Sequence, residues 1–315
     1  MNVTETAALL RSRDRVLLLT HVRPDGDTIG SAAALCRALR DIGKEGYLLP
    51  NPEITVTYAP YAAPYWAPEG WEPSFVVSVD IAALSLLPEN AKAYAGCIDL
   101  AVDHHPSQEF FAAETCLEAE SAACGEIIHA ILLELGVTVT KRIAECLYVA
   151  ISTDTGCFKF SNTTSNTHRT AAALIEAGAD VYPINKLFFD TKSFSRLRME
   201  AKLTETMEFY ADGMVGVCVM PKRLLAEFSA TEDDLDSISG FARSIEGVRI
   251  GVMIREVEDG LGKISLRTEA PYDAAQICGL LGGGGHAAAA GATIEGTLEQ
   301  AKRATLAAIA EVTGE

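Results

Sequence analysis

The chain has 315 residues and carries 43 acidic and 26 basic side chains, which gives a formal net charge of −17 at pH 7 and a pI of about 4.8. Hydrophobic residues make up 49% and charged residues 22%, a composition typical of folded globular proteins. The acidity excludes broad electrostatic binding of long DNA or RNA, because such binding needs a basic face that displaces counterions from many phosphates. The net negative charge does not exclude a small nucleotide that is held by a few local contacts.

The first part of the chain alternates short apolar runs with helical patterns. Residues 15–20 (RVLLLT) predict a buried strand, and residues 28–42 predict a helix that ends at Gly43. Two more strands are predicted at residues 75–80 and 98–103, and three more helices at residues 125–135, 143–151 and 167–177. This alternation favours an α/β fold with a mostly parallel sheet.

The second part of the chain has a different pattern. Residues 186–205 are mixed in charge and predict a helical connector. Strands are then predicted at residues 214–220, 248–257 and 263–267, and a terminal helix at residues 298–312. We therefore expect an N-terminal domain at residues 1–188, a connector at 189–208 and a smaller α+β domain at 209–315, with a cleft between the two domains.

The apolar runs are too short to span a bilayer, and no signal region precedes the first predicted elements. Eight cysteines are scattered along the chain without a C-x-x-C pair, and several lie inside apolar runs, where a thiol behaves as a small hydrophobic group. These features predict a soluble cytoplasmic protein that has no disulfide framework and does not associate with a membrane.

Residues that can bind metals collect where the predicted strands end. They are His21, Asp25 and Asp27 after the first strand, Asp80 after the second, Asp103, His104 and His105 after the third, and Asp154 after a helix. Carboxyl ends of strands form one edge of an open α/β sheet, and ligands bind at that edge. Four of these carboxylates, those of Asp25, Asp27, Asp80 and Asp154, would repel one another, and two divalent cations sharing one carboxylate would neutralise them.

The mixture of imidazole and carboxylate groups suits Mn²⁺, Zn²⁺ or Fe²⁺ better than Mg²⁺. Two metals about 3.5–4 Å apart suit in-line phosphoryl displacement. Each segment taken alone has a simpler explanation: Asp25 and Asp27 as a turn and helix cap, Asp80 as a cap, and His104 and His105 as ordinary polar residues. The coincidence of all four segments at one edge favours the metal site.

The segments HVRPDGDTIG, VSVD, VDHHP and ISTDTGCFKFSNTT resemble, in order and separation, the four motifs of the DHH phosphoesterase superfamily. The later segments ISLRT and GGGGHAAAAG resemble the DHH-associated domain of its RecJ-type branch. The resemblance implies a catalytic N-terminal domain and a substrate-binding C-terminal domain, and it covers nearly the whole chain.

The resemblance also implies roles for the residues that match the motifs. One metal would be held by His21, Asp25 and Asp80, and the second by Asp27, Asp80, His104 and Asp154, with Asp80 bridging the two. His105 would face the substrate phosphate, and Asp103 would accept a hydrogen bond from an imidazole and fix its orientation.

The glycine run near residue 283 follows an apolar segment and opens an alanine-rich stretch. Four glycines can serve as a mere flexible joint. At the N-terminus of a helix, however, Gly283, Gly284 and Gly285 would let backbone N–H groups approach a phosphate or a base, with His286 and Arg267 as partners for the oxyanion. His129 and His168 have no such neighbours in the sequence, and we expect them to be structural or surface residues.

Branches of the superfamily differ in what is appended to the catalytic domain. Related pyrophosphatases usually lack the GGGGH motif, full RecJ-type exonucleases are longer, and membrane-bound cyclic-dinucleotide phosphodiesterases carry transmembrane regions. The chain is therefore most similar to the compact bacterial oligoribonucleases that degrade very short RNA and also dephosphorylate 3′-phosphoadenosine 5′-phosphate.

The resemblance implies two divalent ions, with Mn²⁺ the first choice, and attack on the phosphorus by metal-bound hydroxide. The expected substrates are short oligonucleotides, which yield 5′-mononucleotides, and 3′-phosphoadenosine 5′-phosphate; a homodimer is a further family expectation. Two alternatives stay open: a phosphodiesterase of cyclic or linear di-adenylate, and a nucleotide sensor without catalysis.

Overall fold

The computed structural model describes residues 1–235 and 238–314. The chain divides into two compact units, Met1–Thr191 and Lys192–Glu315, each built on its own sheet. The division falls inside the segment predicted as the connector, residues 189–208. The units are described separately below.

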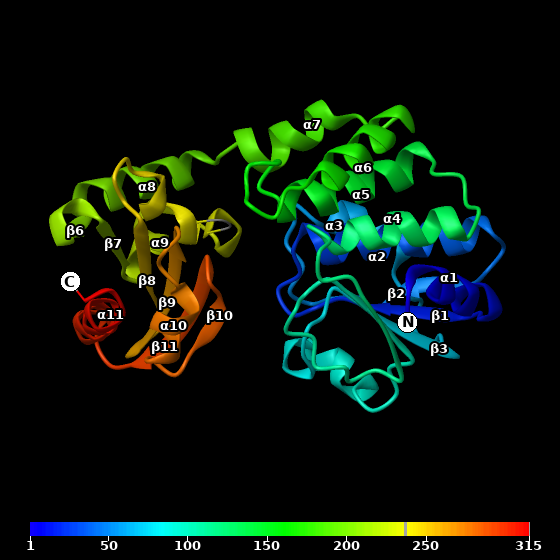
Figure 1. Ribbon diagram of the computed structural model, residues 1–315, viewed down its shortest axis with the longest axis horizontal. Helices are drawn as coiled ribbons and strands as arrows, with labels where there is room; N and C mark the ends of the chain where they lie inside the picture. The colour runs from blue at the N-terminus through cyan, green and yellow to red at the C-terminus, as the bar shows by residue number, and fades with distance from the viewer. Residues whose placement is uncertain (236–237, 315) are drawn as a thin grey trace. The chain divides into compact units, whose positions relative to one another are not determined.

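The first unit is built on a five-stranded parallel sheet with the strand order β2-β1-β3-β4-β5. Its strands are β1 (Val16–Leu19), β2 (Gly46–Leu48), β3 (Phe75–Val79), β4 (Leu100–Asp103) and β5 (Glu114–Leu117). Its helices are α1 (Val3–Ser12), α2 (Gly26–Asp41), α3 (Ala59–Ala62), α4 (Cys124–Glu134), α5 (Lys141–Asp154), α6 (Ser165–Glu176) and α7 (Val181–Asn185), followed by a π-helical turn at Lys186–Asp190. The predicted parallel α/β fold is confirmed, and Figure 1 shows α2, α4 and α5 together on one side of the strands.

Alternate residues of the central strands contribute to two separate cores. Leu18 and Val77 pack in the larger core, together with apolar residues of α2, α4 and α5. Leu17, Leu19 and Val76 lie in a smaller core, covered by the irregular segments with 3₁₀ turns at Leu84–Leu86 and Glu89–Tyr94. Because both faces of the sheet are covered, its central strands β1, β3 and β4 are buried throughout and lack the alternation of apolar and polar residues.

Helices α2 and α5 approach each other closely at glycines of α2. A Cβ atom added to Gly30 would lie 2.3 Å from the carbonyl oxygen of Cys146 and 2.9 Å from the backbone nitrogen of Ala150. A Cβ atom added to Gly26, the first residue of α2, would lie 2.3 Å from the hydroxyl of Thr153. These glycines therefore hold the start of α2 beside the end of α5.

The second unit has a mixed six-stranded sheet with the order β10-β11-β9-β8-β7-β6, in which only β7 and β8 pair in parallel among the pairs that the described residues form. Its strands are β6 (Glu208–Tyr210), β7 (Val215–Met220), β8 (Ile250–Glu258), β9 (Leu261–Thr268), β10 (Gly284–His286) and β11 (Ala289–Glu295). Its helices are α8 (Phe194–Thr206), α9 (Arg223–Phe228), α10 (Ala274–Gly279) and α11 (Leu298–Thr313), with 3₁₀ turns at Ala211–Gly213, Glu232–Leu235, Ile238–Gly240 and Ala242–Ser244. One face packs on α10 and α11, and the other on α8 and α9.

The helix that we expect after the glycine run does not form. Gly284–His286 is strand β10, and the alanines that follow form β11, which pairs with β9. A Cβ atom on Gly283 would lie 2.1 Å from the carbonyl oxygen of Gly291, and one on Gly285, whose φ is 145°, 2.6 Å from that of Ala289. Pairing with an established strand outweighs the intrinsic preference of alanine for a helix, and close backbone contact explains the glycines.

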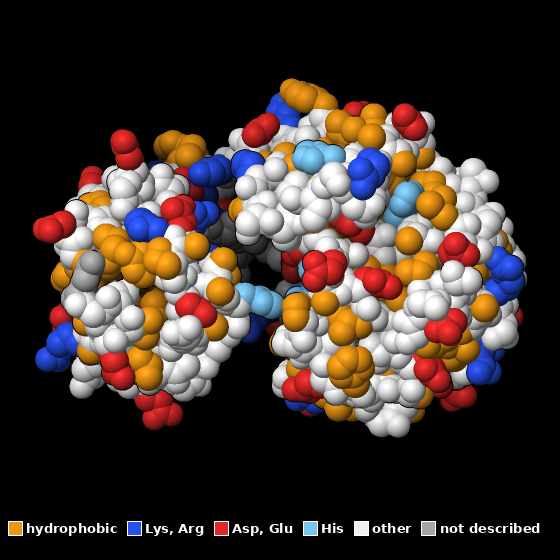
Figure 2. Space-filling model, viewed as in Figure 1, with side chains coloured by type: hydrophobic (Ala, Val, Ile, Leu, Met, Phe, Trp, Pro, Cys, Tyr) orange, Lys and Arg blue, Asp and Glu red, His pale blue; other side chains and the backbone are white. Residues whose placement is uncertain are grey.

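None of the helices formed by residues 1–235 and 238–314 is long and apolar enough to cross a membrane. All eight cysteines are free thiols, and burial raises the pKa of Cys36, Cys146 and Cys218 to about 12. Acidic side chains are spread over the visible face of each unit rather than gathered in one patch (Figure 2).

Replacing Gly30 with alanine tests the contact between α2 and α5. We expect Gly30→Ala to lower the free energy of unfolding of the first unit by about 2 kcal/mol, because the added methyl group meets rigid backbone, although alanine favours an isolated helix. Urea unfolding followed by tryptophan emission reports this unit alone, since Trp66 and Trp71 are the two tryptophans of the chain.

Gly96→Ala is the matched control, because nothing lies within 4 Å of its added Cβ atom. Its stability should stay within about 1 kcal/mol of the wild type. Equal urea midpoints for the two variants would contradict the packing explanation.

Candidate metal centre

The side chains singled out in the sequence of the first unit lie together at the carboxyl edge of its sheet. His21 follows β1, Asp25 and Asp27 begin α2, Asp80 follows β3, Asp103 ends β4, His104 and His105 follow it, and Asp154 is the last residue of α5. In a parallel sheet, these strand ends share one edge, and α2 and α5 reach it through the glycine contacts described above.

Among the described residues, three sets of three side chains have ligand atoms within 4.8 Å of one another. They are His21, Asp25 and Asp80; Asp27, His104 and Asp154; and Asp80, His104 and His105. Asp80 belongs to two of the sets, and so does His104. Imidazole and carboxylate groups in this mixture can hold a first-row transition metal such as Mn²⁺ or Zn²⁺.

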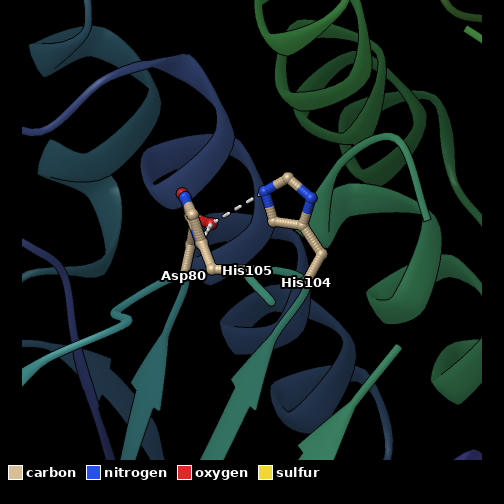
Figure 3. Close-up of side chains that lie close together, drawn as sticks. All are labelled: Asp80, His104 and His105. Atoms are coloured by element: carbon tan, nitrogen blue, oxygen red, sulfur yellow. Dashed lines mark ion pairs between the residues drawn. The ribbon is translucent and has the colours of Figure 1, made fainter. Parts of the chain in front are cut away.

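Asp80 is the centre of the group. Its side chain is 3% exposed, and its backbone has a φ of 61°, an uncommon conformation for a residue other than glycine. Its Oδ1 atom is buried and accepts no hydrogen bond from the described residues, and it lies 3.5 Å from Nε2 of His104, toward which it points in Figure 3. A buried carboxylate oxygen without a donor is costly, and a bound cation would satisfy it.

The imidazoles of His21 and His104 are oriented by backbone carbonyls. Nδ1 of His21 lies 2.8 Å from the carbonyl oxygen of Val22, and Nδ1 of His104 lies 3.1 Å from that of Ser121. A carbonyl oxygen can only accept, so the proton of each neutral ring is on Nδ1. Nε2 of both rings then carries the lone pair, as a metal ligand requires.

The carboxylate of Asp27 is held by two helices. Its Oδ1 accepts from the hydroxyl of Ser31 at 3.0 Å and from N–H of Gly125 at 2.9 Å, and its Oδ2 accepts from N–H of Cys124 at 2.6 Å. Helix α4 has no side-chain cap of its own, because Ala123 precedes it. Asp27 therefore caps α4 from a distance, and this fixes its position.

Asp25 caps the helix on which Asp27 lies. Its Oδ1 accepts from N–H of Asp27 at 3.0 Å and of Thr28 at 3.2 Å, and it lies 3.5 Å from Nε2 of His21. The helix-cap explanation of this aspartate is thus correct, and the same side chain also joins the cluster. The two interpretations do not exclude each other.

Three of the crowded carboxylates, those of Asp27, Asp80 and Asp154, have raised pKa values. Asp25 differs, because burial raises its pKa but the His21 imidazole and two backbone N–H groups outweigh burial and lower the pKa to about 2. Burial raises the pKa of Asp80 well above its usual value, and the carboxylates of Asp27 and Asp25 raise it further. Burial and the Asp27 carboxylate raise the pKa of Asp154 to about 8, although His104 acts in the opposite direction. A bound cation would favour the ionised carboxylates and so lower these pKa values.

Asp103 and His105 form a second arrangement beside Asp80. Asp103 is fully buried, and its Oδ1 lies 2.7 Å from Nδ1 of His105 and also accepts from the backbone N–H groups of His104 and His105. The amide of Gln108 donates to Oδ2 of Asp103 at 2.6 Å. The Asp103 carboxylate therefore fixes the orientation of the His105 ring, and the His105 side chain is 31% exposed.

The sequence did not identify Gln108 or Asn162 as parts of the site. Gln108 also donates to the carbonyl oxygen of Ile81, and Asn162 donates to the backbone carbonyl of Asp154 at 3.2 Å and approaches its Oδ2 at 3.5 Å. Both are neutral amides in irregular segments, so neither periodicity nor charge distinguishes them. His129 on α4 and His168 on α6 do not belong to any of the three sets.

The residues singled out in the second unit lie in its sheet. Arg267 of β9 pairs with Ala289 of β11, which in turn pairs with His286 of β10, so the side chains of Arg267 and His286 share one face. The guanidinium of Arg267 donates to the hydroxyl of Ser239 at 2.9 Å, and burial together with nearby Arg243 lowers its pKa. Gly283, Gly284 and Gly285 are exposed beside this row.

The comparisons with known proteins agree with this architecture. The DHH family, N-terminal domain, matches residues 15–151, and the DHHA1 domain matches residues 215–315. The bifunctional oligoribonuclease and PAP phosphatase NrnA of Thermus thermophilus is 32% identical over 311 residues, which cover 94% of this chain and 89% of that protein.

Solved structures share the fold. An exopolyphosphatase-related protein from Bacteroides fragilis aligns with a TM-score of 0.87 at 24% identity, over 98% of this chain and 95% of that one. The exonuclease RecJ bound to manganese aligns with a TM-score of 0.51 at 14% identity, over 98% of this chain and 94% of that one.

Cation binding at this cluster should release protons, because in the metal-free protein the pKa of Asp154 is raised to about 8 and that of Asp80 is raised well above its usual value. The affinity for Mn²⁺ should therefore rise between pH 6 and pH 8, by up to about tenfold per pH unit for each proton displaced. Calorimetric titration in two buffers of different ionisation enthalpy counts these protons. Asp154→Asn should release fewer, and an affinity that does not change with pH would contradict the expected protonation.

Proposed function

Because the chain belongs to the DHH family of phosphoesterases, we propose that it hydrolyses very short oligoribonucleotides to 5′-mononucleotides and 3′-phosphoadenosine 5′-phosphate to AMP. The observation that carries this proposal is the buried cluster around Asp80, whose orphaned oxygen and flanking imidazoles suit cations. The name of the Thermus thermophilus relative supports the choice of substrates.

Two divalent cations would occupy the cluster. We assign His21, Asp25 and Asp80 to one, and Asp27, Asp80, His104 and Asp154 to the other, with Asp80 shared. When bound, the cations supply positive charge for the phosphate and lower the pKa of water. Mn²⁺ is our first choice, because the ligands are mixed nitrogen and oxygen donors and the related RecJ structure holds manganese.

Asp103 and His105 act on the substrate rather than on a cation in this proposal. Asp103 fixes Nδ1 of His105, so the substrate phosphate is met by Nε2. When Nε2 carries a proton, it donates a hydrogen bond to a phosphate oxygen as negative charge develops there. Gln108 and three backbone or ring N–H groups keep the Asp103 carboxylate in place.

We assign the binding of the remaining part of the substrate to the second unit. Arg267 and His286, side by side on one face of its sheet, would bind a phosphate, and Arg267 can do so through two N–H groups. Gly283, Gly284 and Gly285 leave the backbone accessible to a phosphate or a base. The hydroxyl of Ser239 holds the Arg267 guanidinium ready for this contact.

A phosphodiesterase of di-adenylate and a nucleotide sensor are the alternatives. A sensor has no use for a complete set of metal ligands, so metal content after Mn²⁺ loading separates it from the enzyme. Turnover of linear di-adenylate, mixed-sequence dinucleotides and 3′-phosphoadenosine 5′-phosphate by one preparation separates the two enzymatic candidates.

Removal of a shared or central ligand tests the metal assignment. Asp80→Ala and His104→Ala should each reduce Mn²⁺-dependent hydrolysis of a 5′-phosphorylated dinucleotide by roughly 100-fold or more, because a cation site loses a ligand. His129→Ala is the control, since His129 lies outside the cluster, and it should keep wild-type activity. Near-wild-type rates for Asp80→Ala would show that the assignment is wrong.

Substrate length provides an independent test. The net charge of −17 repels long polyanions, whereas a dinucleotide presents little charge away from the cluster. We expect kcat/KM at low salt to fall by roughly tenfold or more between a dinucleotide and a 24-nucleotide RNA, and this difference should narrow as salt screens the repulsion. Equal values for both RNAs at low salt would exclude a preference for short substrates.

A further inference from the structure

The segment that follows Asp154 is a strained turn. Gly156, Cys157 and Phe158 have successive φ values of 55°, 59° and 63°, so two residues with side chains adopt the left-handed conformation side by side. Such residues persist only where their surroundings enforce the conformation, and they gather at functional sites. Here the turn begins directly after a residue of the cluster.

Hydrogen bonds enforce the turn at both ends. N–H of Cys157 donates to the carbonyl oxygen of Ser152 at 2.7 Å, and N–H of Phe158 donates to the hydroxyl of Thr155 at 3.1 Å. Further along, Asn162 bonds to the backbone carbonyl of Asp154 and also to that of Ala122 at 3.0 Å. The segment therefore begins directly after Asp154 and returns to it through the hydrogen bond of Asn162.

The strain places Phe160 over this turn. A Cβ atom on Gly156 would lie 2.4–2.7 Å from three carbons of the Phe160 ring, so one part of the ring rests on the glycine backbone. The residue is nevertheless 52% exposed. The glycine is required both by its positive φ and by the ring above it.

Packing of the core does not require Phe160, because Phe158 already anchors the segment. The ring of Phe158 stacks on His168 with centroids 5.4 Å apart and contacts Tyr148 at 5.8 Å, and it packs against the main core. Phe160 is not part of any of the buried cores that the described residues form. The turn thus anchors the ring of Phe158 and leaves that of Phe160 half-exposed, while the backbone N–H of Phe160 donates to the carbonyl oxygen of Thr155, the neighbour of Asp154, at 3.0 Å.

We propose that Phe160 is a platform on which a nucleobase of the substrate stacks, and that it makes the site select nucleotides over other phosphate esters. This inference rests on the proposed function. An exposed aromatic ring with a fixed position binds any base through its face, without reading its hydrogen bonds. It would thereby accept fragments of any sequence while the cluster holds the phosphate.

The test compares 3′-phosphoadenosine 5′-phosphate with ribose 3,5-bisphosphate, which has the same phosphates and no base. Phe160→Ala should raise KM for the adenosine compound by roughly 5- to 100-fold, leave kcat nearly unchanged, and leave kcat/KM for the base-free compound unchanged. Phe160→Tyr should behave as the wild type, and Phe160→Leu, apolar but not aromatic, should behave as Phe160→Ala. Metal content should be equal in all variants.

Equal losses on both compounds, no loss on either, or wild-type behaviour of Phe160→Leu would overturn the inference. If the wild type hydrolyses neither compound, the proposed hydrolysis of 3′-phosphoadenosine 5′-phosphate is wrong. Binding of AMP compared with ribose 5-phosphate, measured by calorimetry, then decides the role of Phe160 alone. Weaker binding of AMP by Phe160→Ala, with ribose 5-phosphate unaffected, would support the platform, and equal affinities would contradict it.

Discussion

The hydrogen bonds between Asp27 and the start of α4 join two helices of the first unit at the clustered carboxylates. The carboxylate comes from the first turn of α2, and the N–H groups of Cys124 and Gly125 come from α4. This contact replaces a local cap, because Ala123 cannot supply one. Asp27 therefore belongs both to the cluster and to the contact between α2 and α4. Replacing it would also change how these two helices pack.

The same dual use recurs around the site. Asp25 caps α2, the backbone carbonyls of Val22 and Ser121 orient the imidazoles, and the glycines of α2 allow α5 to bring Asp154 close. Groups with excess negative charge are thus placed by neutral backbone groups, which need no counterion of their own. Asp80 is the exception, because its buried Oδ1 accepts no hydrogen bond from the described residues. The unpaired oxygen of Asp80 lowers the stability of the cation-free protein, and the same oxygen would increase its affinity for a cation.

The sequence predicted the parts of the fold that depend on strong local patterns. Continuous apolar runs identified β1, β3 and β4, and the acidic and histidine residues after them identified the edge of the sheet. The carboxamides of Gln108 and Asn162 were missed, because their roles come from contacts between segments distant in the chain. The three-residue β2 and the partly exposed β5 were missed for lack of a pattern, whereas α1 carries a capping box from Asn2 to Glu5 that could have been recognised. The hairpin of β10 and β11 was mistaken for a helix because its alanines favour one.

The positions of the clustered residues along the chain have a consequence for synthesis. The set of His21, Asp25 and Asp80 is complete once β3 has been made, but the set of Asp27, His104 and Asp154 must wait for the last residue of α5. The hydrogen bonds of Asp27 with α4 form only after α4 has been made. A nascent chain therefore passes through a stage in which His21, Asp25 and Asp80 have all been made. At that stage Asp27 still lacks its hydrogen bonds with α4. The order of translation thus sets the order in which the two sets of side chains become complete.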